Sequence, residues 1–199
     1  MPSARRYDFK ILLASRGKES AFRERQVELA RLTPGDAVLD VGCGTGTLAI
    51  AAAKAVGAEG SVYGVDPSLD LLARAEKKAR RAGVEVGFLT ASGDRLPFND
   101  DSFDVVVCTL VFHHLPGPAV HGTIQEVRRV LKSGGRLLAI DIGGPQDASR
   151  RTFHGATTFN LDSFVPRLPE AGFKAIDAGS IESGMRSLEH LTYFLAELD

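Results

Sequence analysis

The chain has 199 residues, which suits one domain with a sizeable hydrophobic core. Hydrophobic residues make up 44% of it and the mean hydropathy is -0.02, as in globular proteins. With 24 lysines and arginines against 25 acidic residues, the charge balance excludes the strong basic field that marks binding to nucleic acid or an acidic membrane. Cys43 and Cys108 have neither zinc-ligand nor disulfide-framework spacing, so we expect a protein of the reducing cytoplasm without a metal site.

The N-terminal segment predicts a helical cover. Its apolar run, residues 11–14, is too short for a signal peptide or a membrane span. A helix over residues 18–32 would turn Phe22, Leu29 and Leu32 inward, and we expect it over the carboxyl edge of a sheet. Glutamates alternate with the arginines of this N-terminal segment, which predicts a solvated face rather than a basic patch. These arginines are Arg16, Arg23, Arg25 and Arg31.

Strand and helix patterns alternate from residue 36 onward. The runs "AVLDV", "SVYGVD", "VEVGFLT", "FDVVVCTLVF" and "GRLLAID" predict strands of a parallel sheet with crossover helices. A helix over residues 68–82 has Ser68 as its N-cap and ends at Gly83. A second helix over residues 119–131 places on one face Val120, Ile124, Val127 and Leu131.

The last part of the chain predicts a loop, a helix and two strands. Residues 143–160 are rich in glycine, serine, threonine and charge, which is typical of a loop. A short helix near 161–171 and strands near 173–178 and 190–196 follow. We therefore expect a single α/β domain with a helical cover (1–35), a core (36–141) and a C-terminal part (142–199).

The stretch "VLDVGCGTGTLAI" joins the first predicted strand to a helix through three glycines. A dinucleotide-binding turn has the spacing G-x-G-x-x-G, whereas this loop follows G-x-G-x-G and has Thr47 in place of the third glycine. The acid before the loop, Asp40, would face a positive group more favourably than a phosphate. The loop therefore favours a cationic ligand, and a plain turn is the alternative. Its glycines are Gly42, Gly44 and Gly46.

Asp66 ends the second predicted strand. Its carboxylate is suited to accept hydrogen bonds from both hydroxyls of a ribose. The same acid, followed by Pro67 and Ser68, could instead cap the next helix. A ribose contact would not distinguish an NAD site from a site for another nucleoside, because both ligands contain a ribose.

Four stretches, "VLDVGCGTG", "GVDPSLDLLARA", "LPFNDDSFDVVVCTLVFHHL" and "RRVLKSGGRLLAID", resemble in order and spacing the class I S-adenosylmethionine-dependent methyltransferases. The similarity is greatest to the branch with the ubiquinone and menaquinone biosynthesis methyltransferases. It implies a doubly wound, Rossmann-like, seven-stranded and mostly parallel sheet with an antiparallel last strand. It also implies S-adenosyl-L-methionine as cofactor, bound by residues 36–141, and residues 142–199 on the acceptor side.

The resemblance also implies roles for single residues. Asp40 and the loop from Gly42 through Cys43 and Gly44 to Gly46 would face the methionine part of the cofactor. Asp66, with Pro67 beside it, would hold the ribose. Backbone groups of the segment from Cys108 through Thr109 to Leu110 would contact the amino-acid end.

One motif departs from the family pattern. Where relatives read D-A-x-x-L-P-F, this chain reads "ASGDRLPF", with Ser92 in place of the acid that accepts the adenine amino group. We expect Ser92 and Gly93 to line the adenine site and to weaken binding, because a neutral hydroxyl is a poorer acceptor than a carboxylate. The alternative is a shifted loop in which Asp94 serves as the acceptor.

His113 and His114 follow the fourth strand, at the rim between cofactor and acceptor in the family. Either ring could take the proton of the acceptor, because a histidine titrates near neutrality; the alternative is a packing role. His154 is a second candidate for an acceptor contact. His121 and His190 are assigned to surface or packing.

The stretch "VCTL" lacks the N/D-P-P-Y/F motif with which methyltransferases of this fold clamp an extruded base. We therefore expect a small-molecule acceptor and no nucleic-acid partner. Two other functions remain open: a non-catalytic methyltransferase-like binding domain, and a NAD-dependent oxidoreductase. Neither the acceptor nor the oligomeric state can be read from the motifs.

Overall fold

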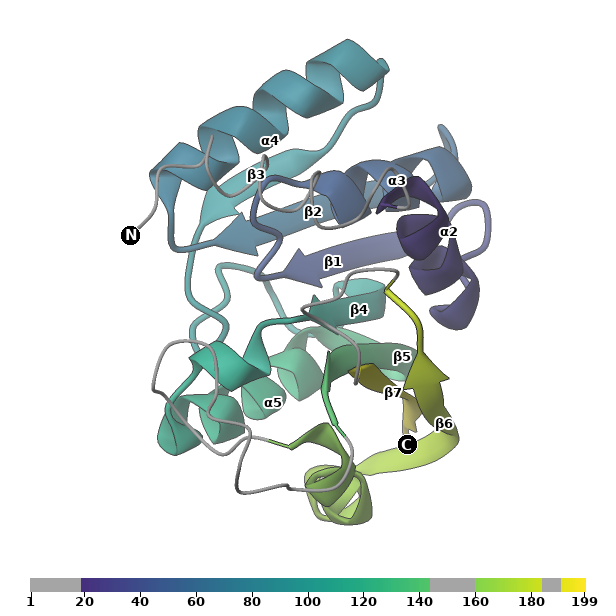
Figure 1. The fold of residues 1–199 in the computed structure, drawn as a ribbon, viewed down its shortest axis with the longest axis vertical. Coiled ribbons are helices and arrows are strands. Elements are labelled where there is room, and N and C mark those ends of the chain that lie inside the picture. Colours follow the sequence, from purple (N-terminus) through teal and green to yellow (C-terminus); the bar gives the residue numbers. More distant parts are fainter. Residues whose placement is uncertain (1–18, 144–159, 184–190) are drawn as a thin grey trace.

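A computed structural model describes residues 19–143, 160–183 and 191–199, and its centre is a seven-stranded sheet (Figure 1). The strand order is β3-β2-β1-β4-β5-β7-β6. Strands β3 to β5 in this order pair in parallel, and β7 is antiparallel to both of its neighbours. The predicted doubly wound fold with an antiparallel last strand is confirmed. The strands are β1 (Ala37–Val41), β2 (Ser61–Asp66), β3 (Gly87–Thr90), β4 (Phe103–Thr109), β5 (Leu131–Ile142), β6 (Phe173–Ile181) and β7 (Leu191–Leu198).

Helices cover both faces of the sheet. In Figure 1, α2, α3 and α4 gather on one side and α5 lies on the other. Side chains alternate accordingly: Val38 belongs to the apolar cluster with α2 and α3, and Leu39 to the cluster with α5. The helices are α2 (Glu19–Leu29), α3 (Thr47–Val56), α4 (Leu69–Ala82) and α5 (Gly117–Val130), with short 3-10 helices η1 (Phe112–His114), η2 (Leu161–Ser163) and η3 (Val165–Ala171).

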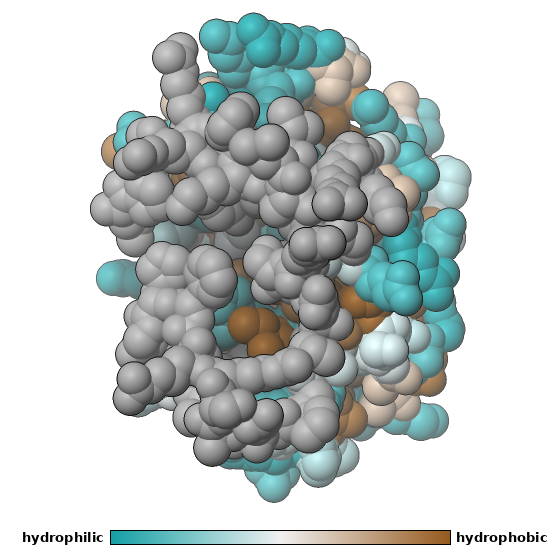
Figure 2. Space-filling model, in the orientation of Figure 1, coloured by the Kyte–Doolittle hydropathy of each residue, from teal (hydrophilic) through white to brown (hydrophobic). Residues whose placement is uncertain are grey.

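The predicted caps of α4 are confirmed. The Ser68 hydroxyl accepts from the backbone N–H of Leu71 at 3.4 Å, and Gly83 ends the helix in the left-handed conformation with φ 68. Figure 2 shows hydrophilic surface over α4, where Lys77 and Arg80 are exposed. This amphipathic helix places its apolar face on the sheet.

Two predicted helices differ from those observed. Leu131 is not a helical residue but the buried first residue of β5, because α5 ends at Val130. The helix expected near residues 161–171 is split into η2 and η3. Pro166 and Pro169 supply no backbone N–H there, which disfavours a continuous α-helix.

Helix α2 differs most from its prediction. It packs against α3, and Phe22 and Leu29 join the apolar cluster on that face of the sheet. The prediction of a solvated arginine-rich face is wrong at Arg23, whose side chain is only 14% exposed. Gln26 on the same helix is fully buried at 0% exposure.

Within the described segments, no helix has the length and apolar character needed to cross a membrane. Cys43 and Cys108 are both free and buried there. Burial raises the pKa of both thiols, so neither is suited to act as a nucleophile.

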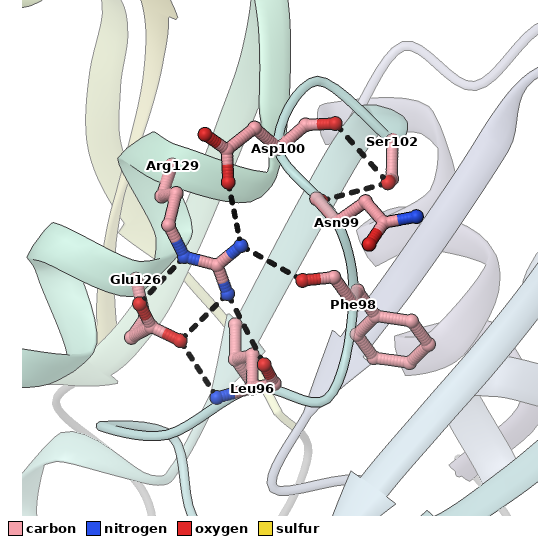
Figure 3. A network of polar contacts seen from close by, with 7 residues as sticks. All are labelled: Leu96, Phe98, Asn99, Asp100, Ser102, Glu126 and Arg129. Atoms are coloured by element: carbon pink, nitrogen blue, oxygen red, sulfur yellow. Dashed lines mark hydrogen bonds and ion pairs between the residues drawn. The ribbon is translucent and has the colours of Figure 1, made fainter.

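Arg129 on α5 fixes the loop that carries the "LPF" motif (Figure 3). Its Nε and Nη2 donate to the Glu126 carboxylate at 2.7 and 2.8 Å. Its Nη1 and Nη2 donate to the backbone oxygens of Phe98 and Leu96 at 2.7 and 3.1 Å. Nη1 also pairs with Asp100 at 2.9 Å. Hydrogen bonds from Arg129 hold the pKa of Glu126 below its usual range, so the network is ionised at neutral pH.

Replacing Arg129 by methionine is expected to lower the free energy of unfolding by about 2–4 kcal/mol, because Glu126 and two backbone oxygens lose their donor. Urea unfolding at pH 7 measures the change. The matched control is Arg80→Met, since the ion pair of Arg80 with Glu76 is exposed and such pairs contribute about 0.5 kcal/mol or less. Equal losses in both variants would contradict the assigned role of Arg129.

Candidate functional site

The glycine loop lies between the carboxyl end of β1 and the first turn of α3. The N–H groups of Gly42 and Cys43 both donate to the Val65 carbonyl, at 2.8 and 3.0 Å, which ties the loop to β2. Gly46 has φ 73, and a Cβ built on it would lie 2.8 Å from Ala75 and from Phe88. Side chains of α4 and β3 therefore press on the loop, and only glycine fits at this position.

Asp40 is 2% exposed at the end of β1. Burial raises its pKa from 3.8 to about 7, with a smaller contribution from Asp66, although the charge of Arg23 and a backbone hydrogen bond from Ala49 act in the opposite direction. Among the described residues, its Oδ2 has no hydrogen-bond partner. A buried carboxylate with an unpaired oxygen is poorly stabilised by itself and is suited to bind a cationic group.

Asp66 ends β2 and is 8% exposed. Its Oδ2 accepts from the N–H of Gly44 at 3.0 Å, and its Oδ1 accepts from the N–H of Ser68 at 2.9 Å. The capping alternative is thus realised in part, since this contact orders the entry to α4. Each carboxylate oxygen has two lone pairs, so Asp66 can still accept from a diol. Pro67 beside it is exposed.

The adenine-side candidates lie together after β3. The Ser92 hydroxyl donates to Asp94 at 2.5 Å, and both side chains are exposed. A Cβ on Gly93 would lie 2.9 Å from the hydroxyl of Thr123 on α5. Ser92 and Asp94, which the sequence presents as alternatives, therefore form one hydrogen-bonded pair.

The end of β4 is conformationally unusual. Leu110 has φ 57, in the left-handed region that a branched side chain seldom adopts. Its N–H already donates to the Ile140 carbonyl at 2.8 Å. The Thr109 hydroxyl is buried and has no partner among the described residues. Backbone strain next to an unsatisfied polar group is characteristic of ligand-binding positions.

His113 is held by Asp141, the fully buried acid near the end of β5. His113 Nδ1 lies 2.7 Å from Asp141 Oδ1, and Asp141 Oδ2 accepts from the backbone N–H of Phe112 at 2.9 Å. An ionised Asp141 requires the proton on Nδ1, which makes Nε2 the basic nitrogen. The ring of His114 lies 3.8 Å from that of His113, centroid to centroid.

Three residues near the predicted site were missed by sequence reasoning: Asp141, Arg23 and Gln26. An acid that ends an apolar strand was the available signal for Asp141. His121 is exposed on α5, as expected. His154 and His190 lie outside the described residues. The described part of the chain contains no group of three or more His, Cys, Asp or Glu that could hold a metal ion.

A methyltransferase-domain family model matches residues 38–135. The 2-phytyl-1,4-naphtoquinone methyltransferase of Trichormus variabilis is 32% identical over 158 residues, which cover 78% of this chain and 67% of that protein. The chain belongs to the class I S-adenosylmethionine-dependent methyltransferases. This confirms the predicted family, enzyme class and cofactor, S-adenosyl-L-methionine, and it decides against the NAD-dependent alternative.

Two further comparisons place the methyltransferase among its relatives. The demethylmenaquinone methyltransferase of Lactobacillus johnsonii is 35% identical over 141 residues, covering 70% of this chain and 57% of that protein. The chain thus spans between 57% and 67% of these two relatives. A SAM-dependent methyltransferase structure from Aquifex aeolicus, 22% identical, superposes with a TM-score of 0.77 over 96% of this chain and 97% of the other, which shows the shared fold.

The local chemistry of this methyltransferase fits its cofactor. S-adenosylmethionine carries a sulfonium and an α-ammonium, both cationic, and Asp40 offers a buried carboxylate oxygen without a partner among the described residues. A pyrophosphate, by contrast, would meet the negative charges of Asp40 and Asp66.

Replacing Gly46 by alanine is expected to lower the free energy of unfolding by about 2–4 kcal/mol, because the new methyl group meets Ala75 and Phe88 in addition to the left-handed backbone penalty. Gly44→Ala is the matched control. Gly44 has φ 55, but a Cβ on it meets nothing within 4 Å, so about 1–2 kcal/mol is expected. Thermal unfolding of both variants tests the difference; a larger loss at Gly44 would show that packing against α4 is not the constraint.

Proposed function

We propose that the cofactor binds across the carboxyl ends of β1 and β2. Asp40 and the loop Gly42–Gly46 hold the methionine part, Asp66 holds the ribose, and the pair Ser92–Asp94 with Gly93 lines the adenine. Support comes from the fold, in which ligands of open α/β sheets bind at this edge, and from Asp40 Oδ2, which has no hydrogen-bond partner within the described ranges. The segment from Thr109 to Leu110 closes the amino-acid end.

We further propose that the methyl acceptor is a small aromatic molecule with an acidic hydroxyl, of the quinol class. The observation that carries this proposal is the His113–Asp141 pair, because an imidazole with a basic Nε2 is suited to take a hydroxyl proton. The names of two relatives, a 2-phytyl-1,4-naphtoquinone and a demethylmenaquinone methyltransferase, agree with this class. Near-neutral charge supports a small molecule over nucleic acid.

The bound cofactor supplies a methyl group already activated on a sulfonium. His113 takes the proton of the acceptor hydroxyl, which raises electron density on the neighbouring ring carbon. That carbon would form its bond to the methyl group that the cofactor supplies, and the sulfur would keep the electron pair of the broken methyl–sulfur bond. The proton of the same ring carbon would then pass to water, and the His113 imidazolium would return its proton to the oxygen, which restores the aromatic ring and its hydroxyl. Asp141 keeps the imidazole in the orientation and tautomer that this transfer needs.

The test is turnover of 1,4-dihydroxynaphthalene by the purified chain, measured as S-adenosylhomocysteine formed and as methylated naphthalenediol by mass spectrometry. One methylated product per S-adenosylhomocysteine is expected. The matched control is 1,4-dimethoxynaphthalene, which has no hydroxyl proton and should not react. Cofactor binding without turnover of this or related quinols would overturn the acceptor class and favour a non-catalytic binding domain.

Cofactor binding is expected to release a proton near pH 7. The pKa of Asp40 is about 7 in the free protein, and a cationic ammonium at its oxygen lowers it. Affinity should therefore fall up to about 10-fold per pH unit below 7 and level off above 8. The charged groups around Asp40 are Arg23 on α2 and Asp66 on β2. Calorimetry in phosphate and in Tris separates proton release from binding heat, and equal apparent heats would contradict the prediction.

We also place the enzyme in the cytoplasm. Its two cysteines are free thiols in the described part of the chain, as suits a reducing compartment.

A further inference from the structure

Helix α2 and strand β1 hold three polar side chains that each have one buried atom without a hydrogen-bond partner among the described residues. Gln26 is 0% and Asp40 is 2% exposed, and the Arg23 side chain is 14% exposed. Within the described ranges, Arg23 Nε, Gln26 Nε2 and Asp40 Oδ2 are buried atoms without a hydrogen-bond partner. Such atoms are rare in folded proteins, and several together indicate a polar ligand.

The guanidinium group of Arg23 contacts three residues of its own helix. Its Nη1 donates to Gln26 Oε1 at 2.9 Å, which uses the amide oxygen of Gln26 and leaves the amide nitrogen as a donor. Its Nη2 lies 3.8 Å from the Glu19 carboxylate, too long for a strong hydrogen bond. The guanidinium carbon lies 5.5 Å from the ring centroid of Phe22, which supports the orientation of the side chain. Arg23 and Gln26 therefore present unused donors together.

Arg23 lies close enough to Asp40 for its charge to oppose the rise in the pKa of that carboxyl. Yet no ion pair or hydrogen bond joins Arg23 to Asp40 among the contacts of the described residues. Arg23 and Gln26 thus offer donors for an anion, and the nearby Asp40 offers a carboxylate oxygen for a cation. That arrangement complements a zwitterion, and an α-amino acid group carries both charges on adjacent atoms.

We propose that Arg23 and Gln26 bind the α-carboxylate of the cofactor while Asp40 binds its α-ammonium. The proposal rests on the cofactor site proposed above and adds a specificity: these three residues select ligands with an intact amino-acid end. Arginine is suited to this task because its planar fork matches a carboxylate. Helix α2 thereby becomes part of the cofactor site rather than a cover alone.

The test compares S-adenosylmethionine with its decarboxylated analogue, S-adenosyl-3-methylthiopropylamine, by isothermal titration calorimetry. The wild type is expected to bind the complete cofactor roughly 10- to 100-fold more tightly. In Arg23→Met this preference should fall to about 3-fold or less, through loss of affinity for the complete cofactor alone. Gln26→Leu should reduce the preference in the same direction. Circular dichroism and thermal unfolding check that both variants fold.

The matched control is Arg25→Met, since Arg25 lies on the same helix and pairs with Glu28 at an exposed position, 56% exposed. Its preference should equal that of the wild type. If Arg23→Met weakens both ligands equally, or keeps the wild-type preference, the carboxylate assignment is wrong. If the wild type binds neither ligand, the cofactor site itself is wrong, an outcome distinct from failure of the Arg23 assignment.

Discussion

Replacing Asp40 by asparagine is expected to weaken cofactor binding at least about 100-fold and to make the fold more stable above pH 7. Asparagine keeps the size of the side chain and its acceptor oxygen, so the backbone hydrogen bond from Ala49 can persist. It removes the negative charge that would pair with the ammonium. Affinity falls while stability rises because the Asp40 carboxylate favours binding of the cationic ligand but destabilises the ligand-free fold.

The sign of the stability effect follows from the two pKa values of Asp40. The carboxyl titrates near 3.8 when solvated and near 7 in the folded protein, so the folded state binds the proton more tightly. Stability from this group is full below pH 3.8 and declines as the pH rises to 7. The difference between the two pKa values limits the loss in free energy of unfolding to about 4 kcal/mol. The variant should therefore gain at least about 1 kcal/mol at pH 8, or roughly 2–4 °C in Tm, and less at pH 5.

Thermal unfolding at pH 5 and pH 8, with calorimetry of S-adenosylhomocysteine binding, measures both effects. The control is Asp104→Asn. Asp104 accepts from the Ala37 N–H at 2.9 Å and pairs with Lys132 at 2.8 Å, so this variant should lose stability and keep its cofactor affinity. A less stable Asp40→Asn at pH 8 would show that Asp40 is satisfied in the free protein.

The framework of the fold was predictable because its signals are local. The β1 and β2 runs are largely apolar, and α4 carries its own cap at Ser68 and its stop at Gly83. The glycine spacing and Asp40 likewise lie within one short stretch. Each of these patterns predicts the local structure from neighbouring residues alone, without information about distant residues.

The missed residues depend on long-range contacts. Arg23 and Gln26 resemble the residues of any polar helix face, and they are shielded from solvent because α2 packs against α3. Asp141 lies 28 positions from His113 in sequence, and the pairing of β4 with β5 brings them together. The periodicity of apolar residues in the sequence gives no information about such long-range contacts. Polar residues at a site are where local pattern and final structure differ most.

Replacing His113 by alanine, or Asp141 by asparagine, is expected to lower kcat roughly 100- to 1000-fold, with the affinity for cofactor changed less than about 3-fold. In Asp141→Asn the new side-chain amide can donate to Nδ1, which would place the histidine proton on Nε2 and remove the basic nitrogen. Asp141 also accepts backbone N–H groups at Phe112 and Ile142, so removing its charge weakens the hydrogen bonds that hold this loop as well.

Acceptors whose hydroxyl groups differ in pKa distinguish a variant that has lost its catalytic base from one in which the loop is displaced. A naphthalenediol with electron-withdrawing substituents ionises without a base, so it should recover most of the lost rate in both variants, whereas a displaced loop would slow every acceptor alike. His121→Ala, exposed on α5, is the control and should keep full activity. Unchanged kcat in His113→Ala would remove this histidine as the base, and a large loss in His114→Ala alone would transfer the role to its neighbour.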